Sequence, residues 1–259
     1  MLLPHGFWGL PTSSVDWCEA NYVHSRFVAE WFNTLSSLAM VAVGLVGLWL
    51  HRRVLERRFL FAFALVSLVG VGSVAFHGTL LFQLQMLDEL PMLYLVTLIV
   101  YILFEDRPTR RFGRWFPALL WAYVALLTVL CSVSRGQVEF WVFQVSFTTL
   151  EFYALGRVYW LQRRLDAATR TLYRWGMLAY AVAMACWLVD LKACAWVSAA
   201  NPQLHAWWHV LVSVGFYLLL LVIASHRLRT LGQTFEVAFT PVPRLRAGAG
   251  LRSEAGSPG

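Results

Sequence analysis

The sequence contains seven apolar stretches, each close to the ~20 residues that an α-helix needs to cross a bilayer. Hydrophobic residues make up 59% of the 259-residue chain and charged residues 14%, whereas soluble domains average about 45–50% and about 25%. A helix satisfies its own backbone hydrogen bonds, which is what lipid requires. The sequence therefore predicts an all-α bundle of seven transmembrane helices, at about residues 31–50, 59–82, 86–104, 115–133, 138–161, 174–193 and 204–225.

The arginines predict how this bundle is oriented. Seventeen of the 21 basic residues fall on one side, four in each of the first, third and fifth connections and five after residue 225. Because cytoplasmic loops carry an excess of Lys and Arg, we expect an extracytoplasmic or lumenal N-terminus and a cytoplasmic C-terminus. This placement explains the net charge of +7 without nucleic acid. Residues 1–30 have no pattern of a cleaved signal peptide.

The same reading divides the chain into three parts. We expect an extracytoplasmic segment at 1–30, a transmembrane domain at 31–225 and a cytoplasmic tail at 226–259. The tail is rich in Arg, Gly and Pro, which favours disorder.

Polar and ionisable residues at membrane depth are expensive and are candidates for function. Given the predicted orientation, five of them fall at one depth, in the extracytoplasmic half of the bundle: Ser73, His77, Asp88, His205 and His209. Two pairs, 73 with 77 and 205 with 209, are spaced four apart, so each pair shares a helix face.

Three imidazoles plus one open position form the ligand set of a catalytic zinc site, which places His77, His205 and His209 around one ion. Asp88 then suits a general base, and Ser73 suits a donor to a developing oxyanion. Each residue also has an ordinary explanation. A transmembrane Ser often bonds back to a carbonyl, a buried His often joins two helices, and Asp88 is placed to cap its helix.

Two other buried acids, Glu151 and Asp190, are expected to form structural pairs with Arg157, Lys192 or a tyrosine. The remaining histidines lie at segment ends or in loops and are expected to be solvated: His5, His24, His51 and His226.

The N-terminal segment contains the acidic stretch Asp16-Trp17-Cys18-Glu19-Ala20-Asn21, followed by Glu30. Side-chain oxygens at this spacing, completed by backbone carbonyls, suit a hard cation such as Ca²⁺. A solvated acidic cap before the first helix fits the same residues.

Four cysteines are too few for a disulfide scaffold. Cys18 and Cys194 are both expected on the extracytoplasmic side, where thiols oxidise. We therefore predict a bridge between them that ties the N-terminal segment to the connection before the last helix.

Several short motifs, in order, resemble those of the alkaline ceramidases, seven-helix intramembrane amidases of a superfamily that includes the adiponectin and progestin receptors. The matching pieces lie within residues 6–225: Asp16-Trp-Cys-Glu-Ala-Asn21, Ala29-Glu-Trp-Phe-Asn-Thr34, Gly72-Ser73, Phe76-His77, Leu87-Asp-Glu-Leu-Pro-Met92 and Leu204-His-Ala-Trp-Trp-His209.

The resemblance implies a role for each candidate residue. It implies that His77, His205 and His209 hold Zn²⁺, that Asp88 activates water, and that Ser73 stabilises the oxyanion. It further implies a calcium site made by Asp16, the Trp17 carbonyl, Glu19, Asn21 and Glu30. Cys18 and Cys194 match the disulfide positions of the family.

The expected activity is zinc-dependent hydrolysis of ceramide, or of another N-acyl sphingoid lipid, to a sphingoid base and a fatty acid. The alternatives are an ester hydrolase of the same superfamily, a heptahelical receptor with structural zinc, and a metal transporter. The expected partners are the lipid substrate and membrane lipids, with no nucleic acid and no obligate protein partner. The expected location is the endoplasmic reticulum or Golgi membrane in a eukaryote and the inner membrane in a bacterium.

Overall fold

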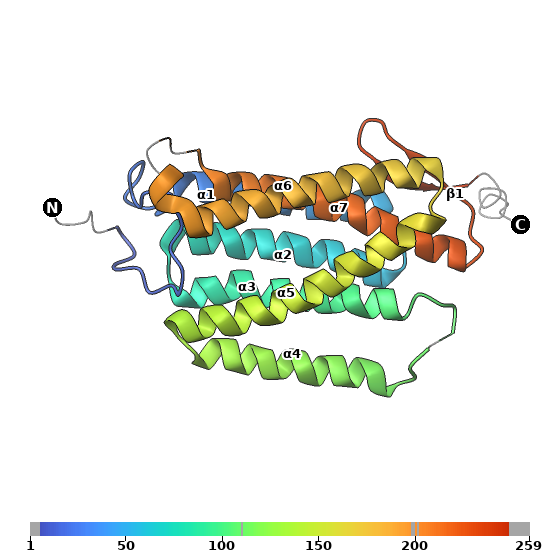
Figure 1. The fold of residues 1–259 in the computed structure, drawn as a ribbon, viewed down its shortest axis with the longest axis horizontal. Coiled ribbons are helices and arrows are strands. Elements are labelled where there is room, and N and C mark those ends of the chain that lie inside the picture. Colours follow the sequence, from blue (N-terminus) through green and yellow to red (C-terminus); the bar gives the residue numbers. More distant parts are fainter. Residues whose placement is uncertain (1–5, 110, 198–199, 201, 249–259) are drawn as a thin grey trace, which may run out of the picture.

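The computed structural model describes residues 6–109, 111–197, 200 and 202–248. Within these residues, seven long helices form an elongated bundle, and a short β-hairpin follows them (Figure 1). The elements are α1 (Trp31–His51), α2 (Arg57–Thr79), α3 (Phe82–Phe104), α4 (Trp115–Val133), α5 (Gly136–Leu161), a 3₁₀ turn η1 (Gln162–Arg164), α6 (Ala167–Val197), α7 (Leu204–Thr230), β1 (Phe235–Ala238) and β2 (Arg244–Ala247).

The predicted helical architecture is confirmed, and six of the seven long helices in the described residues are long and apolar enough to cross a membrane. The exception is α5, whose sequence includes Glu139, Gln144, Glu151 and Arg157. The helices α3 and α6 are longer than expected, since they begin at Phe82 and Ala167 rather than near 86 and 174.

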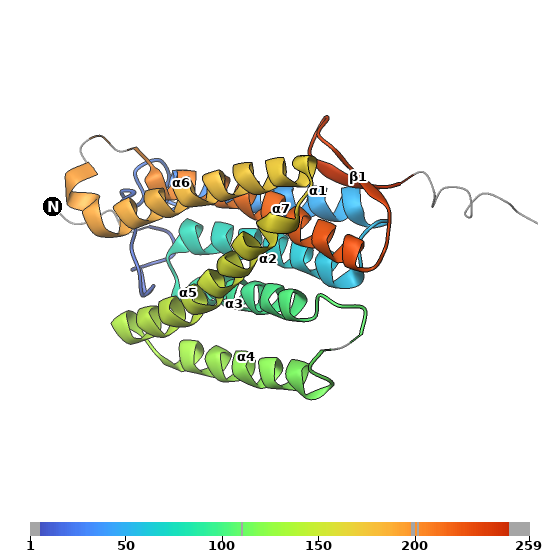
Figure 2. The same ribbon diagram turned by 45° about the vertical axis from the view of Figure 1, so that its right-hand side comes forward.

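Helix α7 is the centre of the bundle. It packs against α1 and α6, while α2 packs against α1 and α3, and α4 contacts only α3 and α5 to any extent in the part of the chain described (Figures 1 and 2). In its most apolar window, 72% of the α7 residues are buried, against 22% for α4. Side chains on α7 are therefore placed to meet residues from several helices.

Helices α2 and α3 approach each other closely at Gly72. A Cβ atom there would lie only 2.1 Å from the carbonyl oxygen of Leu87, so a larger residue would force the helices apart. This carbonyl also lacks its usual helical donor, because Pro91, four residues later, has no N–H. Ser73, the residue after Gly72, and Asp88, the residue after Leu87, therefore belong to helix segments that are in close contact.

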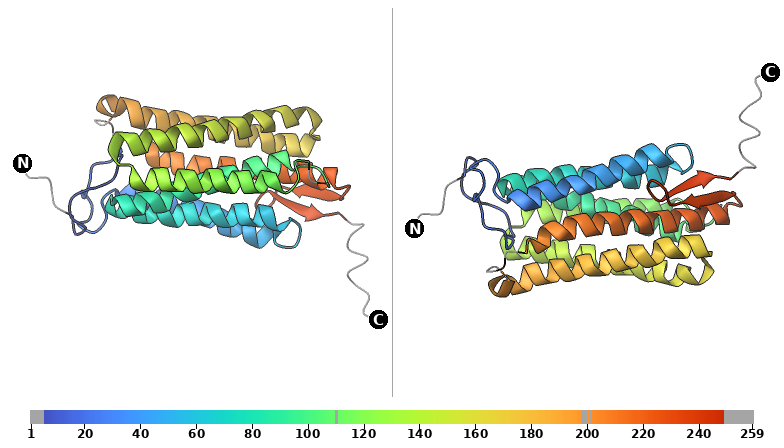
Figure 3. Two further views of the ribbon diagram at one scale, coloured as in Figure 1. Left: turned by 90° about the horizontal axis from the view of Figure 1, so that it is seen from below. Right: turned by 90° about the horizontal axis from the view of Figure 1, so that it is seen from above.

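The N-terminal segment and the C-terminal hairpin lie at opposite ends of the bundle (Figure 3). The prediction of a disordered tail from 226 is wrong for the described part of that region. Helix α7 continues to Thr230, and β1 pairs with β2 in antiparallel register, with Val237 opposite Leu245. Residues 249–259 lie outside the described residues.

The hairpin docks on the end of α1 through His51, which is fully buried rather than solvated as expected. The backbone N–H of Leu245 donates to His51 Nε2 at 3.2 Å, and His51 Nδ1 lies 2.9 Å from the carbonyl of Gly47. His51, predicted to lie in a solvated loop, is thus covered by strand β2, which is far from it in the sequence. His24 is exposed as expected, His226 lies 3.4 Å from Asp106, and His5 is outside the described residues.

Candidate active site

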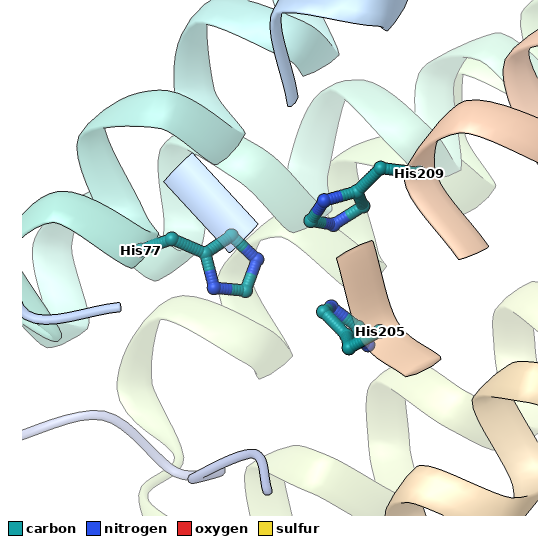
Figure 4. A group of neighbouring side chains, drawn as sticks. All are labelled: His77, His205 and His209. Atoms are coloured by element: carbon teal, nitrogen blue, oxygen red, sulfur yellow. The ribbon is translucent and has the colours of Figure 1, made fainter. Parts of the chain in front are cut away.

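Three histidines converge at the end of the bundle that carries the N-terminal segment. His77 lies in the last turn of α2, and His205 and His209 lie in the first two turns of α7. All three are buried, and one ring nitrogen from each lies within 4.8 Å of the others. Figure 4 shows their rings facing a common point, with centroids 4.6–5.1 Å apart.

A carboxylate orients the first of these rings. His77 Nδ1 bonds to a carboxylate oxygen of Glu30, which leaves Nε2 facing the cluster without a hydrogen-bond partner among the described residues. Histidines that bind metals usually donate their other ring nitrogen to such an acceptor, which fixes the tautomer.

Two serines orient His209. The hydroxyls of Ser36 and Ser37 both donate to the carbonyl of Asn33, at 3.0 and 2.7 Å. Since each hydroxyl has one hydrogen, both oxygens are left as acceptors for His209 Nδ1, which lies 2.9 Å from Ser36 Oγ and 3.3 Å from Ser37 Oγ. His209 Nδ1 therefore carries the proton, which makes Nε2 the unprotonated ring nitrogen.

The cluster fits a zinc ion. His77 Nε2 and His205 Nδ1 are buried ring nitrogens without a partner in the described part of the chain, an arrangement that is costly unless a ligand completes it. Three imidazoles are a common zinc donor set, and here the outer nitrogens of His77 and His209 are held by hydrogen bonds. Among the described residues this is the one group of three or more His, Cys, Asp or Glu side chains so placed.

Ser73 and Asp88 line the same pocket as the three histidines. Both are buried, at 0% and 8% exposure. Asp88 is not a helix cap, because α3 begins at Phe82 and Asp88 lies well inside it. Ser73 Oγ lies 2.9 Å from Ser37 Oγ, and Ser73 is the donor because the Ser37 hydrogen goes to Asn33.

The rest of the pocket is mainly apolar and runs along α3, α5, α6 and α7, as far as Ile223. Ile223 lies fourteen residues after His209, which is about 21 Å along a helix. A long hydrocarbon chain can therefore lie below the polar cluster.

Comparison with known proteins identifies the family of this chain. A family model described as Ceramidase matches residues 9–244. The chain belongs to the ceramidase family. It is 33% identical to alkaline ceramidase 3 of Mus musculus, over 82% of this chain and 83% of that protein. It is 31% identical to the putative alkaline ceramidase dcd3A of Dictyostelium discoideum, over 82% and 85%, and 28% identical to alkaline ceramidase YPC1 of Saccharomyces cerevisiae, over 90% and 83%.

In this family member, Glu19 of the N-terminal segment caps α1. Its two carboxylate oxygens accept the backbone N–H groups of Phe32 and Asn33, at 2.7 and 2.9 Å. The first backbone N–H groups of a helix have no acceptor within the helix, and such a carboxylate supplies one. Its negative charge also interacts favourably with the helix dipole. Burial raises the pKa of Glu19, the two N–H groups oppose this, and the nearby Glu30 adds to the rise.

Glu30 lies between the N-terminal segment and the histidines. It is fully buried, contacts His77, and accepts the backbone N–H of Trp17 at 3.4 Å. Burial raises its pKa to about 8, opposed by a hydrogen bond from Asn33 and assisted by the charge of Asp16. Asn21 Nδ2 donates to Asp16 Oδ1 at 3.2 Å, while Asn21 Oδ1 is buried without a partner among the described residues.

These oxygen donors fit a hard cation. The acidic side chains Asp16 and Asp190 lie near Glu30, and Asn21 Oδ1 has no hydrogen-bond partner in the described part of the chain. A Ca²⁺ ion would compensate both. The residues that sequence reasoning assigned to calcium are thus close together, and one of them, Glu30, also contacts the histidine cluster.

The predicted disulfide is present: Cys18 and Cys194 are bonded, with Cα atoms 5.4 Å apart. Asp190, one turn earlier on α6, supports the same junction, since its Oδ2 accepts the Cys18 backbone N–H at 3.1 Å. Asp190 also accepts a hydrogen bond from the backbone of His205, and the Trp17 ring stacks on the His205 ring at 3.6 Å between centroids.

The pairing expected for Asp190 with Arg157, Lys192 or a tyrosine is therefore wrong: its partners are backbone N–H groups beside the site. The expectation holds for Glu151, which bonds to the hydroxyl of Tyr180.

Proposed function

We propose that this protein hydrolyses the amide bond of ceramide, or of a related N-acyl sphingoid lipid, to release a sphingoid base and a fatty acid. One observation carries the proposal. Three clustered histidines, a carboxylic acid and a hydroxyl share one buried pocket, in a chain whose relatives are named alkaline ceramidases. The apolar extension of that pocket supports a substrate with long hydrocarbon chains.

In this proposal His77 Nε2, His209 Nε2 and a ring nitrogen of His205 hold Zn²⁺. When bound there, Zn²⁺ supplies Lewis acidity toward the amide carbonyl and acidifies water to a pKa near 7. Glu30 and Ser36 hold two of the rings in the binding orientation.

The chain's own groups handle the proton and the developing charge. As water attacks the carbonyl carbon, the Asp88 carboxylate takes its proton and returns it to the amide nitrogen when the C–N bond breaks. Ser73 Oγ–H turns from Ser37 toward the carbonyl oxygen, which gains negative charge. Burial of both groups keeps bulk water away from these steps.

We further propose that Asp16, the Trp17 carbonyl, Glu19, Asn21 and Glu30 bind Ca²⁺. In this role Ca²⁺ stabilises the junction between the N-terminal segment, α1 and the histidines.

We also propose that all seven helices span the membrane, with the N-terminal segment outside the cytoplasm and the hairpin inside. In α5, Gln144 and Glu151 line the pocket, so these polar side chains avoid lipid. In a eukaryotic cell this orientation places the polar cluster near the lumenal face of the endoplasmic reticulum or Golgi. In a bacterium it faces the periplasm.

The test is to purify the protein in detergent, measure its zinc content, and assay fatty-acid release from ceramide and from an ester analogue. His77→Ala should lose zinc, whereas Asp88→Ala should keep zinc and lose turnover. Ser73→Ala should lower kcat by about 10²–10³-fold, the effect of removing one oxyanion donor. Bound zinc without release from any N-acyl lipid would refute the amidase and favour a receptor.

A further inference from the structure

An indole N–H beside the candidate site has no part in the proposed chemistry. Trp17 lines the pocket that also contains Asp88, Ser73 and the three histidines. Its Nε1 is buried and has no hydrogen-bond partner among the described residues. A buried donor without a partner is costly. A donor of this kind at a pocket wall therefore indicates a ligand that brings an acceptor.

The Trp17 ring is held in place by its neighbours. It stacks on the His205 ring with 3.6 Å between centroids and 20° between planes. Trp187 of α6 packs against it with 6.3 Å between centroids, and the next residue, Cys18, is bonded to Cys194. The direction of the indole N–H is therefore fixed relative to His205.

The stacking also restricts what Trp17 can reach. The indole N–H bond lies in the plane of the indole, and the lone pair of an imidazole lies in the plane of the imidazole. Because the two planes are nearly parallel and one ring lies above the other, the N–H does not point at a ring nitrogen of His205. The acceptor of Trp17 is therefore not this histidine, and it lies to one side of the imidazole plane.

The position of Trp17 narrows the nature of that acceptor. His205 lies one turn before His209 in α7, and the pocket extends from His209 in the opposite direction, to Ile223. Trp17 is therefore at the end of the pocket where a headgroup lies, away from the apolar part that suits hydrocarbon chains. An indole is a donor only, so it requires an oxygen that accepts.

We propose that Trp17 forms a headgroup subsite, in which Nε1–H donates a hydrogen bond to the primary hydroxyl oxygen of the sphingoid lipid. In such a lipid the primary hydroxyl ends the molecule on the head side, whereas the other hydroxyl lies where the hydrocarbon chain begins. A hydroxyl can accept this bond and still donate its own hydrogen elsewhere. The assignment rests on the proposed function, and it makes Trp17 a determinant of specificity for hydroxylated headgroups.

The test compares ceramide with the otherwise identical lipid that lacks the primary hydroxyl, at the same acyl chain. The wild-type protein should favour ceramide by about 10–100-fold in kcat/KM, because the deoxy lipid leaves a buried donor unpaired. Trp17→Phe keeps an aromatic ring for His205 and the backbone carbonyl, but it has no N–H. It should lower kcat/KM for ceramide by a similar factor without lowering the value for the deoxy lipid.

Two measurements separate this role from a structural one. The zinc content of Trp17→Phe and its stabilisation by Ca²⁺ should equal those of the wild-type protein. Trp187→Phe is the matched control, since it removes an indole N–H from the adjacent ring in the same pocket wall. It should retain the preference for ceramide, and loss of the preference in both variants would point to packing and overturn the subsite.

Two other results would overturn the subsite and leave the amidase intact. One is a wild-type protein that hydrolyses both lipids equally. The other is a Trp17→Phe protein that loses activity toward both lipids by the same factor, because the N–H would then act on the amide that the two lipids share.

The outcome is also defined if no lipid is turned over, which would refute the amidase itself. The two lipids are then compared by how much each raises the melting temperature of the purified wild-type protein. Greater stabilisation by ceramide than by the deoxy lipid, lost in Trp17→Phe and kept in Trp187→Phe, would support the subsite as a binding site. Equal stabilisation would overturn it.

Discussion

Asp190 offers the sharpest test of how the site is held together. It is 3% exposed, accepts the Cys18 backbone N–H at 3.1 Å, and also accepts a hydrogen bond from the His205 backbone. Trp17, next to Cys18, stacks on the His205 ring. Through these contacts Asp190 positions His205 without touching the substrate. We expect Asp190→Ala to weaken zinc binding, and Asp190→Asn, which keeps an acceptor oxygen, to recover much of it.

The size of the effect follows from the acceptor that is lost. An unsatisfied buried N–H costs about 1–3 kcal/mol. Asp190→Ala makes the metal-binding position of His205 less stable by this amount. The affinity for zinc then drops by about 5- to 150-fold. Loss of an outer partner of a metal ligand has a similar effect, about 10–100-fold.

The assay is zinc affinity by competition with a chromophoric chelator, in detergent and without substrate. Asp106→Asn is the matched control, because Asp106 pairs with Arg157 and His226 at the far end of the bundle. It should lower stability slightly and leave zinc affinity unchanged. An Asp190→Ala protein with a lower melting temperature but wild-type zinc affinity would refute the positioning role.

Three further predictions address other parts of the molecule. Added Ca²⁺ should raise the melting temperature of the wild-type protein, and Asp16→Ala with Glu19→Ala should abolish that response; an unchanged response would remove the calcium site. Cys194→Ser should abolish the mobility difference between reduced and non-reduced protein on a gel, and its persistence would exclude this disulfide as the cause. Glu56 is partly buried, which raises its pKa, but hydrogen bonds and charge from Arg227 and Arg58 outweigh this and lower it. Its contribution is therefore present at neutral pH and lost as pH falls through the lowered pKa, so Glu56→Gln should cost at most about 1 kcal/mol at pH 7. A stability deficit that does not shrink as the pH is lowered below the ordinary pKa of a glutamate would contradict the ion pair.

The sequence was sufficient to predict the helices because the apolar stretches have the length that lipid demands. The histidine cluster was also predictable, since helix direction and the arginine pattern place His77, His205 and His209 at one end of the bundle. The family motifs then assigned roles to these residues, which periodicity alone does not do.

Other parts depend on contacts that no local pattern reveals. His51 looked like a loop residue because the strand that buries it lies nearly 200 positions later. Ser36 and Ser37 were not recognised, since hydroxyls near the start of a helix are common and only the approach of His209 gives them a role. For Asp190 the sequence predicts a side-chain partner. Asp190 instead accepts hydrogen bonds from backbone N–H groups next to the Cys18–Cys194 disulfide, whose cysteines are far apart in the sequence.

The position of two of the three proposed zinc ligands in α7 has a consequence for how the protein is made. His77 is synthesised 128 residues before His205, which at 5–20 residues per second is about 6–26 s. During that interval the nascent chain has one imidazole of the set, and for most of it the chain also lacks Cys194, with which Cys18 pairs. We therefore expect the protein to remain unable to take up zinc or attack lipid until α7 has entered the membrane. Chains that terminate early would then be inert toward the bilayer in which they are inserted.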